Sequence, residues 1–165
     1  MFTSVARTGL HFVPGRVPHR FSVVHVDDLT QALILAAERG LRLEPGVPAL
    51  RRDDSRGIYH IAGDEHPTYA DLGRLIGKAV GRSRVRIVRI PMRAIWAAAL
   101  VVELGMRIRK KSQYLNLDKA REIAAGSWTC SPEKAGRELG FRPAAPMTER
   151  LRQTADWYRA AGWLP

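Results

Sequence analysis

The chain of 165 residues is the size of one domain and is long enough to bury a hydrophobic core. With 45% hydrophobic and 26% charged residues, its composition is that of a folded globular protein and excludes a disordered tail. The single cysteine, Cys130, excludes an internal disulfide framework and a cysteine-rich zinc site. A lone thiol, and an opening segment without the apolar core of a signal peptide, favour a cytoplasmic protein.

The net charge of +11 comes mainly from arginines scattered along the chain. Two basic clusters stand out, at residues 82–89 and 107–111. A basic protein gains affinity for nucleic acid by displacing counterions from phosphates, so a nucleic-acid-binding protein is one hypothesis. No zinc-finger spacing, helix-turn-helix signature or aromatic RNA-binding motif accompanies the clusters, and solvated basic faces explain them better.

The first predicted unit is a strand, a tight turn and a helix. After an opening rich in glycine and proline, residues 21–26 (FSVVHV) are apolar and β-branched and predict a buried strand. Asp28 is expected to cap the following helix, with Gln31 completing a box-like arrangement. The apolar residues of this helix fall on one face, and Gly40 ends it.

A second unit of the same kind follows a polar loop at residues 44–56, which we expect on the surface. Residues 57–62 (GIYHIA) predict a short strand, and Thr68 caps a helix that stops at Gly81. A third strand is predicted at residues 85–90. Short apolar strands alternating with helices indicate an α/β fold with parallel strand pairing.

Pro91 opens the most apolar helix of the sequence, in which Glu103 is the only charged residue from Ala94 to Met106. Its ~16 residues are fewer than the ~20 needed to span a bilayer. We favour a buried helix of a substrate-binding lobe; the alternative is a helix held on anionic lipid by the basic run that follows. Three more helices are predicted, at residues 117–125, 132–139 and 147–161.

Several segments occur in an order that is typical of one enzyme family. They are FSVVHVDDLTQALILAAERG, then GIYHIAG, a helix ending in GKAVG, and the closing segment SWTCSPEKAGRELGFRPAAPMTERLRQTADWYRAAGWL. Together they resemble the extended short-chain dehydrogenases/reductases downstream of their catalytic motif. The resemblance covers nearly the whole chain and implies a single incomplete domain at residues 1–165. It would contain the edge of a Rossmann-type parallel sheet and a mainly helical substrate lobe.

Two motifs that the resemblance implies are missing from the sequence. The family needs a glycine-rich turn to bring backbone against the pyrophosphate of NAD or NADP, and no such turn is present. The family's acid/base tyrosine has a lysine four residues later that lowers its pKa. None of the four tyrosines has that lysine: Tyr59, Tyr69, Tyr114 and Tyr158. We therefore expect no catalytic or cofactor-binding residue in this chain, and NAD or NADP only in an intact enzyme with the N-terminal half.

The resemblance also bears on the substrate. Members that act on nucleotide-sugars tend to carry Arg-Asp-Tyr where this chain has Phe21, Ser22 and Val23, and an Arg-x-Gly-Asp that is absent here. The chain is more similar to the dihydroflavonol-reductase-like and 3β-hydroxysteroid-dehydrogenase-like branch. That branch implies NAD(P)-dependent redox chemistry at a hydroxyl or ketone of a fairly apolar small molecule. A nucleotide-sugar epimerase or dehydratase is the alternative within the family.

Two residues are predicted to bind substrate. We expect Trp96, on the apolar helix, and Phe21 to form opposite walls of a mainly apolar cleft; the alternative for Trp96 is simple packing in the core. Asp28, His25 and His60 are interpreted as structural. No metal site is predicted, because the other histidines lie in loops without metal-ligand spacing: His11, His19 and His66.

The expected partners, besides the substrate, are the N-terminal half of such an enzyme or a second copy of the chain. The rival class is a basic, non-enzymatic module that binds nucleic acid or an anionic membrane surface.

Overall fold

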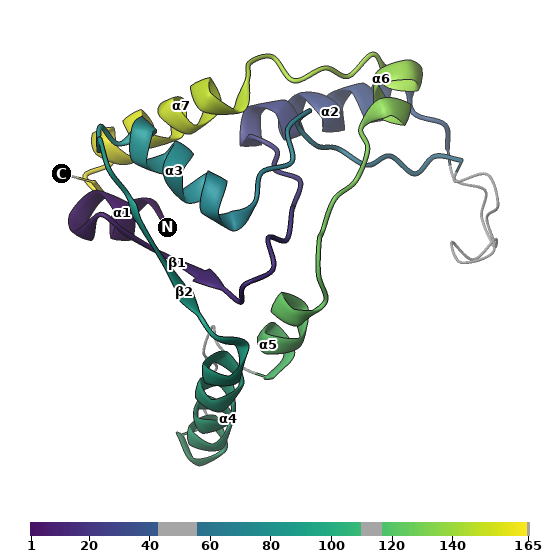
Figure 1. Cartoon of the computed structure of the whole chain (residues 1–165). Helices are drawn as coiled ribbons and strands as arrows, with labels where there is room; N and C mark the ends of the chain where they lie inside the picture. Colours follow the sequence, from purple (N-terminus) through teal and green to yellow (C-terminus); the bar gives the residue numbers. More distant parts are fainter. Residues whose placement is uncertain (43–55, 110–116, 165) are drawn as a thin grey trace. The chain divides into compact units, whose positions relative to one another are not determined.

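The computed structural model describes residues 1–42, 56–109 and 117–164. Over these residues the chain has an α/β fold, as predicted (Figure 1). In chain order the elements are α1 (Phe2–Thr8), β1 (Leu10–Pro14), α2 (Val26–Arg39), α3 (Tyr69–Ala79), β2 (Arg86–Ile90), α4 (Met92–Arg109), α5 (Leu117–Ala124), α6 (Glu133–Leu139) and α7 (Met147–Ala160).

The chain divides into two compact units, each built from separate segments. The first unit comprises Met1–Arg20, Pro67–Trp128 and Leu151–Pro165. The second unit comprises Phe21–His66 and Thr129–Arg150. Helix α7 contributes its first residues to the second unit and the remainder to the first.

The first unit contains a parallel pair of strands, β1 and β2, in which Leu10 lies opposite Arg86 and Pro14 opposite Ile90. The prediction of a parallel sheet and of a strand at residues 85–90 is confirmed. Helix α1 and strand β1 were not predicted, because the opening segment was interpreted as irregular. Arg82, which lies 76 residues after Ala6, stabilises the C-terminal end of α1: its Nε and Nη2 donate to the carbonyl of Ala6 at 3.0 and 2.6 Å.

Helix α3 begins as predicted. The Thr68 hydroxyl accepts from the Asp71 backbone N–H, and the Asp71 carboxylate accepts from the Thr68 N–H, both at 3.2 Å, which completes a capping box. His11, interpreted from the sequence as a loop residue, instead lies in β1 and is only 4% exposed. The Nε2 of His11 donates a hydrogen bond to the Tyr69 carbonyl at 2.9 Å. Gly73 leaves room for this ring, because a side chain at that position would overlap it.

Helix α4 was predicted from Pro91 onward, and the structure confirms it. Ile95 and Ala99 are buried against Ala120 of α5. Trp96, Leu100 and Val101 are 37%, 50% and 69% exposed. Over the described residues, this apolar helix is therefore buried along one side only. No helix in the described ranges is both long and apolar enough to cross a membrane.

The second unit has a small core between α2 and α6. Ala32 of α2 packs with Ala135, Leu139 and Phe141, each at most 2% exposed. Gly140 follows α6 with φ 75°, a left-handed conformation that favours glycine and allows the chain to turn back. The predicted single apolar face of α2 is divided, because Leu33 is 64% exposed while Ala32 is buried.

The interpretation of Asp28 as a helix cap is wrong. Helix α2 begins at Val26 with His25 as its N-cap, and the His25 ring accepts from the Asp27 N–H. Asp28 is instead 3% exposed and forms a buried ion pair with Arg150, whose Nε donates to Oδ2 at 3.0 Å and whose Nη2 donates to Oδ1. The Ala144 N–H donates to Asp28 Oδ1 at 3.1 Å. The carboxylate joins two segments 122 residues apart.

The two strands predicted at residues 21–26 and 57–62 are not strands in the structure. Residues 22–25 and 58–63 are irregular, and a backbone hydrogen bond from Gly63 N–H to the Val23 carbonyl, 2.8 Å, joins them. Apolar β-branched residues favour an extended chain, but a strand also needs a ladder of partners. Most of the predicted loop at residues 44–56 lies outside the described residues.

Candidate binding pocket in the first unit

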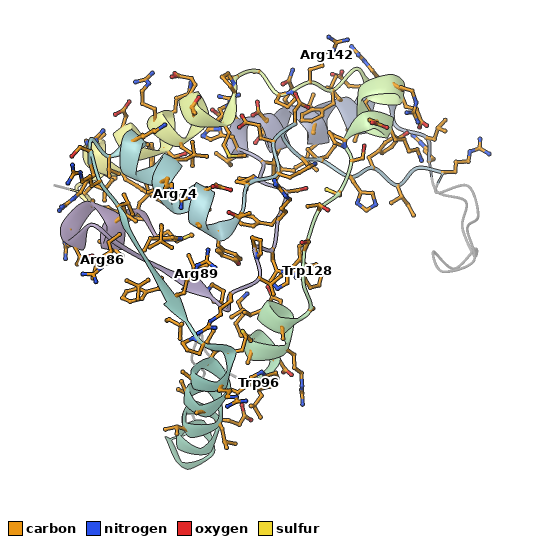
Figure 2. The ribbon with its side chains drawn as sticks, in the orientation of Figure 1. Arg74, Arg86, Arg89, Trp96, Trp128 and Arg142 are labelled. Atoms are coloured by element: carbon orange, nitrogen blue, oxygen red, sulfur yellow. The ribbon has the colours of Figure 1, made fainter. Side chains whose placement is uncertain are left out.

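A pocket of about 260 Å³ lies within the first unit. Its walls come from the end of β1 and the segment after it, the first turns of α3, strand β2, helix α5 and the segment that follows α5. Figure 2 labels three of its lining residues, Arg74, Arg89 and Trp128, which come from three different parts of the chain. Tyr69 and His19 also line it.

Strand pairing positions Arg89. This residue lies opposite Val13 in the parallel register, and both line the pocket. Its Nη1 donates to the backbone carbonyl of Arg16 at 2.9 Å, which holds the guanidinium beside the segment after β1. Arg86, three residues earlier on the same strand, is also exposed but does not line the pocket (Figure 2).

The capping box of α3 places a charged pair, Asp71 and Arg74, at the pocket. Arg74 Nη1 lies 2.9 Å from Asp71 Oδ1, and both side chains are about half exposed. The pKa of Asp71 is lowered, chiefly by the hydrogen bond from the Thr68 hydroxyl, against an opposing effect of burial. Asp71 is therefore a carboxylate at neutral pH, and it orients Arg74 at the pocket.

Backbone hydrogen bonds position Trp128. Its N–H donates to the Arg20 carbonyl at 2.8 Å, and the Arg20 N–H donates to the Ser127 hydroxyl at 3.0 Å. The indole Nε1 donates to the Glu122 carbonyl at 3.3 Å, yet the side chain is 59% exposed. Gly126, which also lines the pocket, has φ 108°, a conformation that side-chain-bearing residues rarely adopt.

This arrangement can bind a ligand but has no acid/base pair for the family's chemistry. The two arginines and the two acidic residues of its lining, Asp71 and Glu122, offer polar contacts, while Trp128 and Val13 offer apolar contact. Tyr69 lines the pocket, but the residue four positions later is Gly73. Among the described residues there is no cluster of side chains that would hold a metal ion.

The residues present do not form the glycine-rich turn that binds the pyrophosphate of a dinucleotide cofactor. Such a site needs a glycine-rich turn that leads from a strand directly into a helix. Strand β2 leads into α4 through Pro91, which has no N–H to offer, and the next helix after Gly15, α2, begins only at Val26. No cofactor-binding residue is therefore assigned.

The predicted substrate residues do not line this pocket. Trp96 lies on α4 in the first unit (Figure 2). Phe21 is the first residue of the second unit and is half buried. Their common cleft stays a prediction. The pocket residues Arg74, Arg89 and Trp128 were not predicted from the sequence. Arg89 lies in the basic cluster at residues 82–89, but no feature of the neighbouring sequence distinguishes it from Arg86.

No protein-family model matches the chain. A ceramide reductase of Caulobacter vibrioides is 26% identical to it over 146 residues, which are 88% of this chain and 41% of that protein. The chain thus spans about two fifths of the length of this curated relative.

Solved structures with a similar fold are again matched over only part of their own length. The crystal structure of gox2253 matches 100% of this chain and 44% of its own, with a TM-score of 0.62 and 20% identity. The UDP-glucose 4-epimerase of Thermotoga maritima matches 97% of this chain and 38% of its own, with a TM-score of 0.58 and 18% identity. The dTDP-glucose 4,6-dehydratase of Bacillus anthracis has a TM-score of 0.55 and 15% identity over 99% of this chain and 39% of its own.

The chain accordingly has an α/β fold similar to part of an epimerase and part of a dehydratase, the latter determined in complex with NAD.

Proposed function

We propose that this chain is the substrate-side portion of an NAD(P)-dependent oxidoreductase or epimerase that acts on a hydroxyl or ketone. It binds the substrate and does not supply the cofactor site or the tyrosine-lysine pair. The observation that carries the proposal is the pocket of the first unit, in a chain whose fold matches part of NAD-dependent enzymes. In this proposal the intact enzyme is located in the cytoplasm.

For the substrate, we favour a fairly apolar molecule with a polar head. The relative from Caulobacter vibrioides is named for ceramide, which has a hydroxyl-bearing head and long apolar chains. The lining of the pocket likewise combines polar groups with an apolar surface. The polar groups are Arg74, Arg89 and Asp71, and the exposed indole of Trp128 is the apolar surface.

A second candidate substrate is a nucleotide-sugar. Two arginines and an exposed tryptophan in one pocket suit a diphosphate and a planar base. The similar structures include an epimerase determined with UDP-glucose. The sequence departures at Phe21–Val23 support the apolar substrate instead.

Binding measurements with two probes separate these candidates. We expect a short-chain ceramide to bind the chain saturably, as measured by tryptophan fluorescence, and UDP-glucose to bind much more weakly. Trp128→Ala should weaken ceramide binding about tenfold, because it removes one aromatic contact of the pocket. Calorimetry with NAD and NADP should show no saturable binding at micromolar concentration.

Arg89→Ala and Arg86→Ala form a matched pair, since both are exposed arginines of β2 and only Arg89 lines the pocket. Loss of ligand binding in the Arg89 variant alone supports the pocket. Preferred binding of UDP-glucose would favour the second candidate. If neither probe binds, the proposed site is wrong, and binding of nucleic acid with a steep salt dependence would then favour the non-enzymatic module.

A further inference from the structure

The first unit has another pocket, of about 530 Å³, which shares no lining residue with the proposed substrate pocket. It lies where the C-terminal ends of α1, α3 and α7 meet the turn that leads from α3 into β2. Three arginines line it, Arg82, Arg84 and Arg159, and no acidic residue is among its described lining residues. We call it the arginine pocket.

Backbone carbonyls hold two of these guanidinium groups in place. Besides its bonds to Ala6, Arg82 donates from Nη2 to the Arg7 carbonyl at 2.9 Å. Arg159 donates from Nη2 to the Ala79 carbonyl at 3.2 Å. These bonds satisfy carbonyls at the C-terminal ends of α1 and α3, which have no partner within their own helices. They also fix both side chains at the pocket, so an incoming ligand would lose less free energy in ordering them.

The positive charge of the arginine pocket is only partly balanced. Arg159 pairs with Asp156 at 2.7 Å, and Asp156 pairs with Arg152 at the same distance, so one carboxylate serves two arginines. Arg84 is exposed and forms no hydrogen bond or ion pair with any described residue, and the same is true of the Ser83 hydroxyl. Capping of the helices therefore does not explain why Arg84 lies beside the other arginines.

We propose that the arginine pocket binds the phosphate group of a small phosphorylated molecule, with Arg82, Arg84 and Ser83 donating hydrogen bonds to its oxygens. The planar guanidinium matches phosphate oxygens in pairs. A phosphate monoester carries about −1.5 to −2 charges at pH 7, which suits the excess of positive charge. Val80 and Leu164, which also line the pocket, offer apolar contact to the rest of the molecule. The inference does not depend on the proposed substrate or its pocket.

A nucleic acid is a different source of phosphate, and the placement of the arginines favours the small molecule. Phosphates repeat along a nucleic acid, so a protein that binds one presents basic groups along an extended surface. Here the three guanidinium groups line a single pocket of limited volume. One phosphate group can meet them together.

Calorimetry of the 165-residue chain with glycerol 3-phosphate tests the proposal, at an ionic strength held constant with sodium chloride. We expect saturable binding of one molecule per chain, and competition by inorganic phosphate. Binding should strengthen as the pH is raised from about 5 to about 7.5, because phosphate gains its second negative charge near pH 6 while guanidinium groups stay charged.

Arg84→Ala should weaken the binding of glycerol 3-phosphate at least about tenfold, because it removes hydrogen bonds to a charged group. Arg84 is exposed and has no partner among the described residues, so the folded state should survive the change, and circular dichroism checks this. The matched control is Arg86→Ala, an exposed arginine of β2 that lines neither pocket (Figure 2). It removes the same charge and should change the affinity less than about twofold.

Thermal melts give a second readout. Glycerol 3-phosphate should raise the melting temperature of the unmodified chain and of the Arg86→Ala variant, because a ligand of the folded state stabilises it. It should raise that of Arg84→Ala much less. An equal rise in all three proteins would show a general effect of the salt and not a site.

Three further results would overturn the proposal. The first is the absence of saturable binding of glycerol 3-phosphate, including the case in which a single-stranded oligonucleotide binds instead. The second is an equal loss of affinity in Arg84→Ala and Arg86→Ala. The third is a loss in Arg89→Ala and not in Arg84→Ala, which would place the phosphate in the other pocket.

Discussion

The two compact units are held together by different kinds of contact. The first unit joins distant segments by a parallel strand pair and by the buried ring of His11. The second unit has a small core around Ala32, Leu139 and Phe141, and it also joins distant segments through the buried pair of Asp28 and Arg150. The comparison indicates that a buried ionic contact contributes to the second unit, whereas strand pairing and a buried histidine ring contribute to the first.

The largest expected effect comes from removing one partner of that contact. Asp28→Asn should lower the free energy of unfolding of the second unit by about 3–5 kcal/mol, because Arg150 would stay buried without its countercharge. Urea unfolding, followed by hydrogen exchange of the α2 amides, measures this.

Asp27→Asn is the control for this change, since the Asp27 side chain is 70% exposed and only 3.7 Å from the same guanidinium. It should cost less than about 1 kcal/mol. Equal effects of the two substitutions would show that burial of the pair does not determine the stability of the second unit.

The next effect tests packing in the first unit. Gly73→Ala places a methyl group where the His11 ring lies, and such overpacking should destabilise by about 1–3 kcal/mol. Gly136→Ala on α6 of the second unit meets only ordinary contact, 3.5 Å from the Phe141 carbonyl, and should stabilise its helix by about 0.5–1 kcal/mol. Thermal melts of the two variants should move in opposite directions. If both are stabilised, His11 does not pack on α3 as described.

A smaller effect is expected at the helix caps. Thr68→Ala removes a reciprocal capping box and should cost about 1 kcal/mol. Ser131→Ala in the second unit removes only a 3.2 Å hydrogen bond from the Glu133 N–H, and it should cost less. Denaturant midpoints of both variants provide the measurement, and a larger loss for Ser131→Ala would contradict the assignment of the box.

The smallest expected effect is a difference between the two units in how their stability depends on pH. Burial lowers the pKa of His11 below its ordinary value of 6.5, despite its hydrogen bond to Tyr69. As pH falls from 6.5 toward that lowered pKa, the unfolded chain binds more protons than the folded one, so the first unit loses stability in this window.

Burial alone would raise the pKa of Asp28, but hydrogen bonds from Arg150 and Ala144 outweigh it, and the pKa is lowered below 3.8. The second unit should therefore lose the stability that ionised Asp28 contributes only below pH 3.8.

Tryptophan fluorescence reports on the first unit selectively, because all four tryptophans lie in it. The urea midpoint measured by tryptophan fluorescence should fall as the pH is lowered from 6.5 to 4. His11→Gln should reduce this dependence of the midpoint on pH. A slope that is unchanged in the His11→Gln variant would show that His11 titrates normally.

The sequence allowed the helices to be predicted because their ends are marked locally. Thr68, Pro91 and Gly140 each act within a few residues, and α3, α4 and α6 begin or end beside them. Strands were predicted less well, because residues 21–26 have strand-forming side chains without a ladder, while residues 10–14 gain one only through residues 86–90.

The pocket could not be predicted for the same physical reason. Its lining residues are separated by up to 115 positions, from Val13 to Trp128, and no local pattern shows that they surround one pocket. Asp28 illustrates the limit at a single residue. An aspartate near the start of a helix predicts a cap, and only the distant Arg150 makes it a buried ion pair.

The division of the chain into interleaved segments has a consequence for its synthesis on the ribosome. The second unit cannot form its ion pair until Arg150 has left the exit tunnel, and the first unit is incomplete until residues 151–165 follow. Early segments such as α2, with Leu33 exposed even in the final structure, must therefore wait unprotected while about a hundred further residues are made. During that interval the exposed apolar residues of the nascent chain favour aggregation.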